Sequence, residues 1–309
     1  MGRRWRSVVA GVLAGWGLAS ASIAQDAPPQ RLHSAVLIYP LIRADRDPVD
    51  GVTRDTHIDL LNLTSRTVQV SCFYVNAQGN FCNEIGFRLT LTPNQPVSWL
   101  ASQGFVSSFT HSAVPPFNGS GELKCVVLPS DPSVDAHNTI QGRAIVFGDD
   151  GQTLGYGAVA FRRLVDGELT SEVELDGVTY TACPDEQHFA FLAAQPGSET
   201  EIILAPCSED LENQVFTTTT VQFVIINEFE EHLSAAITVD CYLRRRLSQV
   251  SSVFKATSLG SETGHLIVRG VQHPVSALLI DRFTVDANAG AALNEPALVG
   301  GRAATIRFP

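Results

Sequence analysis

The sequence predicts an all-β fold made of two tandem β-sandwich modules that arose by internal duplication. Short runs rich in Val, Ile, Leu, Phe and Thr alternate with Asn, Asp, Gly and Pro, the residues that turns require. No apolar run of helical period extends beyond about ten residues. Segments of the first half also recur, in the same order, in the second half. With 309 residues, 44% of them apolar, the chain exceeds the usual size of one domain and can bury two cores.

Strands are expected throughout the first half of the chain. In order, they cover residues 35–42, 58–63, 68–75, 87–91, 123–128, 143–147 and 155–161. In the third of these, Val68, Val70 and Cys72 alternate with Gln69 and Ser71. This alternation is typical of an antiparallel strand with one buried and one solvated face.

Two Asp-Gly pairs predict hairpin turns, because Asp-Gly tolerates the positive φ that such turns need. One is Asp150-Gly151, between the last two expected strands, and the other is Asp176-Gly177, between 173–175 and 178–180. The best short helix is 208–215, with Ser208 as its cap and two acidic residues in its first turn.

The internal repeat sets the expected domain boundaries. Residues 37–40, 57–62, 68–73 and 144–148 resemble residues 203–206, 222–227, 237–242 and 266–270. The match predicts a first β-sandwich over 25–165, a connecting segment with a β-hairpin over 166–183, and a second β-sandwich over 184–309. A single larger barrel is the alternative architecture.

The first residues predict export. Arg3, Arg4 and Arg6 precede a short apolar run over 8–18, and Ser22 and Ala24 are small residues at the positions that a signal peptidase reads. We expect a signal peptide over 1–24, cleaved near Ala24, with twin-arginine export as the less favoured route. The mature protein is then periplasmic or secreted from a bacterium, and no later stretch is long enough to insert into a membrane as a helix.

Net charge limits the classes of partner, and the cysteine pattern limits the classes of site. A net charge of −11 disfavours nucleic acid, because the chain repels phosphate backbones. Six cysteines without a C-x-x-C motif predict disulfides rather than metal or redox sites. They allow 15 connectivities. The repeat favours Cys72–Cys125 and Cys207–Cys241, which leaves Cys82 with Cys183.

Three clusters of polar residues could form sites, and a structural role is favoured for each. Asp55, His57 and Asp59 share a strand face that could hold a divalent ion, but solvated strand faces are commonly polar. Asp45, Asp47 and Asp50-Gly51 have the oxygen ligands of a calcium loop without its twelve-residue pattern. Metal and cofactor sites are therefore not expected.

The third cluster is an acidic knot between two apolar runs, and its members are Glu228, Glu230, Glu231 and His232. The matching position of the first half, 63–66, holds no carboxylate. A hairpin tip is therefore favoured over an active site. Asn227 has the parity of the inward-facing Phe223, so its amide is expected to satisfy backbone groups at the strand end.

An aromatic loop over 99–121 has no counterpart in the second half. Its members are Trp99, Phe105, Phe109, His111 and Phe117. Aromatic side chains in an elaborated loop can form a platform for a glycan or a peptide. The favoured alternative is that they fix a long loop to its own core.

Several segments carry a resemblance to known proteins. They are residues 72–75 (CFYV), 99–104 (WLASQG), 205–210 (APCSED), 221–223, 227–230 and 241–243. On these residues the chain resembles a group of uncharacterised exported bacterial proteins rich in β structure. The resemblance implies export and fold and no activity. The strand pattern is also similar to that of immunoglobulin-like sandwich modules.

These observations predict a non-catalytic exported protein that binds a protein or glycan partner or contributes to the cell envelope. The chain contains no recognised hydrolase, metalloprotease or nucleotide-binding motif. The alternative is a hydrolase, or a subunit of one, whose site carries no recognised motif. A pocket joining His57 or His111 to carboxylates would favour the alternative, whereas exposed Trp99 and Phe109 would favour binding.

Overall fold

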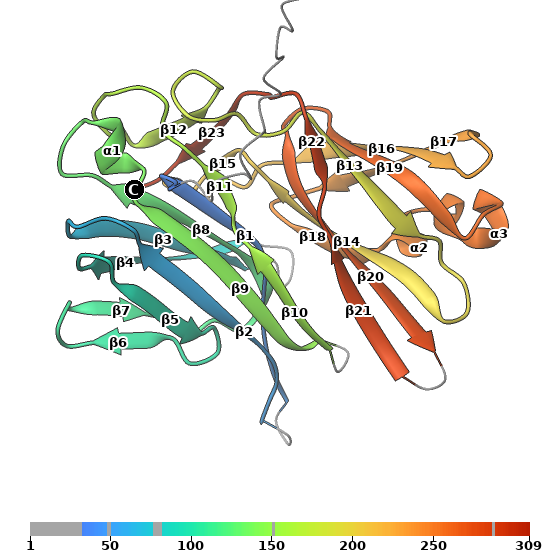
Figure 1. Cartoon of the computed structure of the whole chain (residues 1–309), viewed down its shortest axis with the longest axis horizontal. Coiled ribbons are helices and arrows are strands. Elements are labelled where there is room, and N and C mark those ends of the chain that lie inside the picture. The colour runs from blue at the N-terminus through green and yellow to red at the C-terminus, as the bar shows by residue number, and fades with distance from the viewer. Residues whose placement is uncertain (1–32, 48–50, 77–81, 150–151, 286–287) are drawn as a thin grey trace, which may run out of the picture. The chain divides into compact units, whose positions relative to one another are not determined.

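A computed structural model of the chain describes residues 33–47, 51–76, 82–149, 152–285 and 288–309 (Figure 1). Strands account for 62% of the structure and helices for 6%, so the predicted all-β class is confirmed. The expected signal peptide and the Asp150-Gly151 turn lie outside the described residues. None of the helices within the described ranges combines the length and the apolar character that crossing a membrane requires.

The first half of the described chain forms the first module. Six of the seven predicted strands are present, and the seventh, 155–161, is divided at Ala158 into two strands that pair in different layers. The strands of the module are β1 (Val36–Asp47), β2 (Gly51–Asn62), β3 (Val68–Asn76), β4 (Asn83–Leu91), β5 (Pro96–Leu100), β6 (Phe105–Ser107), β7 (Ser112–Val114), β8 (Gly119–Leu128), β9 (Ile140–Asp149), β10 (Gln152–Gly157) and β11 (Val159–Phe161). A single helical turn, α1 (Val134–His137), precedes β9.

These strands form two layers that are joined at one corner. One layer has the order β5-β2-β9-β10 and the other the order β4-β3-β8-β1-β11, and all of these pairs are antiparallel. β1 and β2 pair only over residues 45–47 and 51–54, where Asp45 lies opposite Arg54. Buried side chains from both layers form one core.

The alternation predicted for β3 holds only over its first residues. Val68 and Val70 are buried and Gln69 is exposed, but Ser71 is also buried. The reason is that β8, the neighbour of β3, is itself buried on both faces from Gly121 to Val127. Burial on both faces also explains the apolar run Cys125–Val127 near the end of β8.

The second module has the same two-layer construction. Its strands are β13 (Glu186–Leu192), β14 (Ser198–Pro206), β16 (Thr219–Asn227), β17 (His232–Val239), β18 (Leu243–Arg246), β19 (Thr263–Gly270), β20 (Val275–Val285), β21 (Asn288–Asn294) and β22 (Ala297–Val299). Short helical segments follow β18: α2 (Leu247–Val250), η1 (Ser252–Phe254) and α3 (Ala256–Leu259). The layers are β17-β16-β19-β13-β22 and β18-β14-β20-β21. Phe254 is fully buried in the core, edge-on to Phe191 and Phe223.

A small third sheet corrects two of the predictions. It contains β12 (Glu172–Leu175), β23 (Ala304–Arg307) and β15 (Glu209–Asp210). Asp176-Gly177 does form a turn, with Gly177 at φ 81°, but β12 pairs with β23 instead of forming the predicted hairpin. The predicted helix over 208–215 is wrong, because its residues form β15 and a turn.

Alternate side chains of the β18-β14-β20-β21 layer pack into two different cores. Ile202 and Leu204 of β14 lie in the core of the second module. Ile203, between them, belongs to the buried cluster of the first module, together with Leu278 and Ile280 of β20. The two sandwiches therefore meet along an apolar face of β14 and β20, which we call the module seam.

The predicted duplication is matched in part by the strand pairing. β2 pairs with β9 as β16 pairs with β19, and each first strand ends in a buried asparagine, Asn62 or Asn227. However, β3 pairs with β4 and β8, whereas β17, its expected equivalent, pairs with β16. The duplication stays a prediction. The strands form separate sheets and not one barrel, so the alternative architecture is wrong.

Candidate functional site

The structure does not bring the five aromatic-loop residues to one surface. Trp99 and Phe117 are buried against Tyr74, whose hydroxyl accepts a hydrogen bond of 2.7 Å from the Trp99 indole N–H. Phe105 is half-buried, whereas Phe109 is 83% exposed and His111 is also exposed. The loop is thus fixed to its own core, and Trp99 is not available as part of a binding platform.

The acidic strand face of β2 serves the fold. Asp55 is buried, and its carboxylate accepts hydrogen bonds from the backbone N–H and the hydroxyl of Ser102. His57 lies 3.4 Å from Asp59, whose other oxygen accepts a bond of 2.6 Å from Arg143. Over the described ranges of the chain, no three His, Cys, Asp or Glu side chains are grouped as metal ligands.

The second acidic group is only partly described. Asp45 forms ion pairs with Arg43 and Arg54. Asp50 and the side chain of Asp47 lie outside the described residues. The part that is described therefore consists of ion-paired surface charge.

The acidic knot is the tip of a hairpin, as the sequence predicts. Ile226 of β16 lies opposite His232 of β17, and residues 228–231 between them are exposed. The side chain of Asn227 holds the turn: its oxygen accepts the N–H groups of Phe229 and Glu231, and its amide donates to the Leu259 carbonyl. These bonds confirm the predicted role of Asn227.

The six cysteines form three disulfides, and one of the predicted pairs is confirmed. Cys72 and Cys125 face each other on adjacent strands and are bonded. The other two predicted pairs are wrong, because the structure joins Cys82 to Cys241 and Cys183 to Cys207. Cys241 follows the end of β17, so it does not occupy the place in the second module that Cys72 has in the first.

A polar cavity of about 480 Å³ lies at the module seam, and we call it the arginine cleft. Its walls come from β1 and β8 of the first module and from β14, β18 and β20 of the second. The lining residues are Arg43, Ser120, Glu201, Tyr242, Leu243, Arg244, Arg246 and Arg282. Glu201 is the only acid in the lining, but Asp45 and Glu199 also pair with two of the arginines, so four arginines face three carboxylates and leave one positive charge in excess.

Strand register and ion pairs place the guanidinium groups. Glu201 of β14 lies opposite Arg246 of β18 and Ile280 of β20. Arg244 contacts both oxygens of the Glu201 carboxylate at 2.8 Å, and Arg282 contacts one of them, Oε2, also at 2.8 Å. Both arginine side chains are mostly buried, whereas that of Arg246 is 55% exposed and lies 3.3 Å from Glu199. Glu201 thus holds two cationic groups in place at the cleft wall.

Tyr242 supplies a neutral polar group to the same cleft. Its hydroxyl lies 3.5 Å from the Ser120 hydroxyl, which comes from the first module. Burial raises the pKa of Tyr242 above its usual value, so the phenol remains protonated and can donate as well as accept a hydrogen bond.

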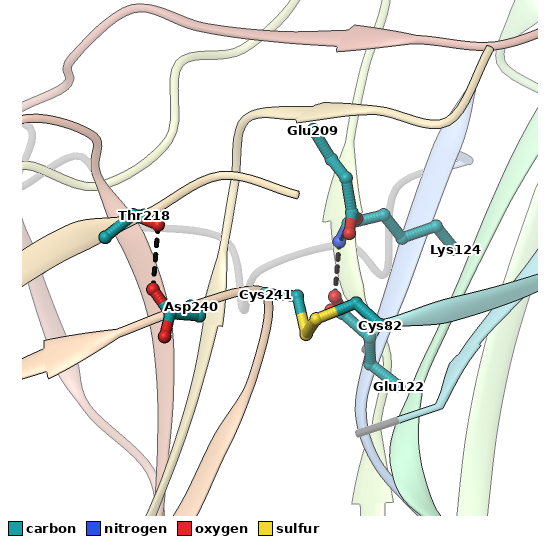
Figure 2. Close-up of a disulfide and its surroundings, with 7 residues drawn as sticks. All are labelled: Cys82, Glu122, Lys124, Glu209, Thr218, Asp240 and Cys241. Carbon is teal, nitrogen blue, oxygen red and sulfur yellow. Dashed lines mark hydrogen bonds and ion pairs between the residues drawn. A yellow bond between two sulfur atoms is a disulfide. The ribbon is translucent and has the colours of Figure 1, made fainter. Parts of the chain in front are cut away.

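A buried cluster of charged residues begins two residues after Ser120 on β8. Figure 2 shows it beside the Cys82–Cys241 disulfide. Lys124 has no exposed surface, and its Nζ contacts the carboxylates of Glu122, at 2.5 Å, and of Glu209. Glu122 and Lys124 come from β8 and Glu209 from β15. A 2.7 Å hydrogen bond from Thr218 to Asp240 fixes the residue before Cys241.

Burial sets the protonation of this cluster. It raises the pKa of Glu122 to about 8, against the opposing pull of Lys124, and it raises the pKa of half-buried Glu84 to about 7. Burial also disfavours the charge of Lys124, but the two neighbouring carboxylates outweigh this effect and raise its pKa. One carboxylate therefore balances the ammonium, and a second carboxyl group retains a proton near neutral pH.

The sequence alone predicts neither the arginine cleft nor the buried charge cluster. The run Arg244-Arg245-Arg246 after Tyr242 was the available signal for the cleft, and a lysine within the apolar strand 123–128 was the signal for the cluster. Their partners lie far away along the chain, so neither signal identifies a site alone.

Comparison of the chain with protein-family models and with curated proteins finds no match, so a functional proposal has to rest on the arrangement of these residues.

Proposed function

We propose that this is an exported, non-catalytic binding protein whose arginine cleft takes an acidic carbohydrate, such as a uronic acid residue of an envelope glycan. The observation that carries the proposal is the composition of the cleft. Four of its eight lining residues are arginines, in a chain with a net charge of −11. Such a local reversal of sign favours an anionic ligand.

The side chains of the cleft suit a sugar that carries a carboxylate. Guanidinium groups bind carboxylates through two parallel hydrogen bonds, and Glu201 already orients Arg244 and Arg282. The hydroxyls of Ser120 and Tyr242 can exchange hydrogen bonds with sugar hydroxyls. A volume of about 480 Å³ lies within the range of small-ligand sites, and the polar lining disfavours a hydrophobic ligand.

The charge of the remaining surface limits how the ligand is recognised. The acidic chain repels anions at long range, but at physiological salt this field decays over about 8 Å. Binding would therefore depend on contact with the arginines, and an isolated negative charge without hydrogen-bonding hydroxyls would be a poor ligand.

Several features support an exported protein. Three disulfides are formed by the described cysteines, and disulfides persist in oxidising compartments such as the periplasm or the exterior. The expected signal peptide over 1–24 agrees with this environment. A glycan of the cell envelope is then within reach of the cleft.

The test is a glycan array probed with the mature chain, followed by calorimetric titration with oligogalacturonate and with a matched neutral oligogalactose. We expect binding of the acidic oligosaccharide only. Arg246→Glu should weaken it at least about tenfold, because the substitution places a negative charge in the cleft. Arg143→Glu is the matched control, since Arg143 is exposed on β9 and does not line the cleft. Equal binding of the neutral sugar, or equal losses in both variants, would refute the proposal.

A further inference from the structure

Lys124 is held at one point between carboxyl groups from two parts of the chain. Glu122 precedes it by two residues on β8, and Glu209 lies on β15, 85 residues further along. Figure 2 shows all three side chains converging beside the Cys82–Cys241 disulfide. The cluster lies where the first module meets the small third sheet, and its charged atoms are out of contact with solvent.

The choice of a lysine at this position is unusual for this chain. Lysine provides only two of its 21 basic residues, and the cations of the arginine cleft are all arginines. Arginine remains protonated in proteins and is not a nucleophile, whereas a buried lysine can lose its proton and attack a carbonyl carbon. The chain therefore places its reactive type of base at the site from which water is excluded.

The carboxyl groups of the cluster are incompletely satisfied. Glu122 Oε2 and Glu209 Oε1 are buried and make no hydrogen bond within the described structure. Buried charge without a full set of partners is costly, and a neutral amide would remove both the ammonium and one carboxylate. Amide formation would therefore lower the free energy of the buried site.

We propose that Lys124 and Glu209 form an intramolecular amide bond, with Glu122 as the proton carrier. Lys124 gives a proton to the Glu209 carboxylate that it contacts, and the free amine attacks Cδ of the resulting carboxylic acid. The C–N bond forms, and the C–OH bond of the carboxyl group breaks. Protonated Glu122 gives its proton to the departing hydroxyl, which leaves as water, and takes a proton from the attacking nitrogen in return. Ammonium plus carboxylate thus become amide plus one water, with no oxidant or other reactant required.

The surroundings favour each step of this condensation. Contact between Nζ and the carboxylate replaces a bimolecular encounter, and such proximity is worth many orders of magnitude in rate. A proton carrier is most effective when its pKa lies near the working pH, and burial brings that of Glu122 to about 8. Because the site excludes solvent, the amide is protected from hydrolysis once the released water has left.

The amide would be a second covalent cross-link between the two halves of the chain. Cys82–Cys241 already joins the two halves, but a reductant opens it. An amide between β8 and β15 resists reduction. The two halves would therefore remain cross-linked when all three disulfides are reduced.

The test is the intact mass of the purified mature chain after complete reduction. We expect a mass lower than the calculated one by one water. A tryptic map should show a branched peptide joining Lys124 to Glu209, because trypsin does not cleave after an acylated lysine. The full calculated mass, or a tryptic peptide that ends at Lys124, would overturn the proposal. An amide to Glu122 would also overturn it.

Two variants separate the roles of the residues. Lys124→Arg retains the charge without a nucleophile, so it should have its full calculated mass and, once reduced, should migrate more slowly in a denaturing gel than the wild type. Glu122→Gln should leave most molecules uncrosslinked. Complete cross-linking of Glu122→Gln would overturn the role of Glu122 as proton carrier. The wild-type mass decides the main claim even if a variant does not fold.

Discussion

The Cys82–Cys241 disulfide should stabilise the fold more than any other, because it closes the longest loop. Its cysteines are 159 residues apart, against 53 for Cys72–Cys125 and 24 for Cys183–Cys207. Replacing both of its cysteines by serine therefore releases the most conformational entropy into the unfolded chain.

The loop lengths give the size of the effect. A loop of 24 residues corresponds to about 3.5 kcal/mol of unfolding free energy at room temperature. For Cys82–Cys241 the other two disulfides shorten the effective loop to about 100 residues, which corresponds to about 4.7 kcal/mol. A Lys124–Glu209 amide would shorten it further and lower this value to about 4 kcal/mol. The order of the two disulfides is the same in either case.

Urea unfolding measures the difference, and the mature chain provides its own probe. Trp99 is the only tryptophan after residue 24, and it is buried in the first module. Its fluorescence and far-UV circular dichroism should shift together if unfolding is two-state. If the Cys82→Ser/Cys241→Ser protein lost less stability than the Cys183→Ser/Cys207→Ser protein, the argument from loop entropy would be refuted.

The same replacement should weaken ligand binding at the arginine cleft. Tyr242 follows Cys241 directly and lines the cleft. Without the disulfide, the segment between β17 and β18 has fewer constraints, and part of the binding free energy is spent on ordering it. Titration of the folded variant with oligogalacturonate should show a lower affinity than the wild type.

Three further outcomes are expected. The folded state keeps protons on Glu122 and Glu84, with pKa values raised to about 8 and about 7 from 4.5, that the unfolded state releases; stability should therefore fall between about pH 5 and about pH 8. Urea midpoints of Glu122→Gln should fall less over this range, and equal slopes in the two proteins would contradict the assignment. Trp99→Phe should cost about 2–3 kcal/mol by circular dichroism, because the buried Tyr74 hydroxyl loses its 2.7 Å donor. Phe109→Ser should change stability by less than about 0.5 kcal/mol, since the side chain is 83% exposed; a larger loss of stability would show an unrecognised contact.

Local patterns identified most strands but not their partners. The β-branched and apolar runs identified β1 to β4 and β8 to β11 of the first module but not β5, β6 and β7, and parity identified Asn227 as a residue that supports a turn. The helix expected over 208–215 failed because Ser208 and Glu209 resemble a capped helix start. Glu209 is instead buried against Lys124, 85 residues away, and a local pattern contains no information about that contact.

Two of the three disulfides and the cleft were beyond sequence reasoning for a related reason. The predicted pairing of Cys241 rested on its alignment with Cys72, but β17 lies beside β16 and not in the place of β3. Arg43 and Arg282 reach the same cavity from strands almost 240 residues apart. Only the fold brings such residues together.

The module seam has a consequence for how the protein opens. β14 is buried on both faces over 202–206 and β20 over 275–280, with Ile203, Leu278 and Ile280 against the first module. Their amide protons can exchange with solvent only when the second core and the seam open together, so they should be the slowest to exchange. In a chain divided near residue 184, these apolar side chains would be exposed to water, and the second module would tend to self-associate. The module boundary that the sequence predicts near residue 184 should therefore not be a boundary in folding.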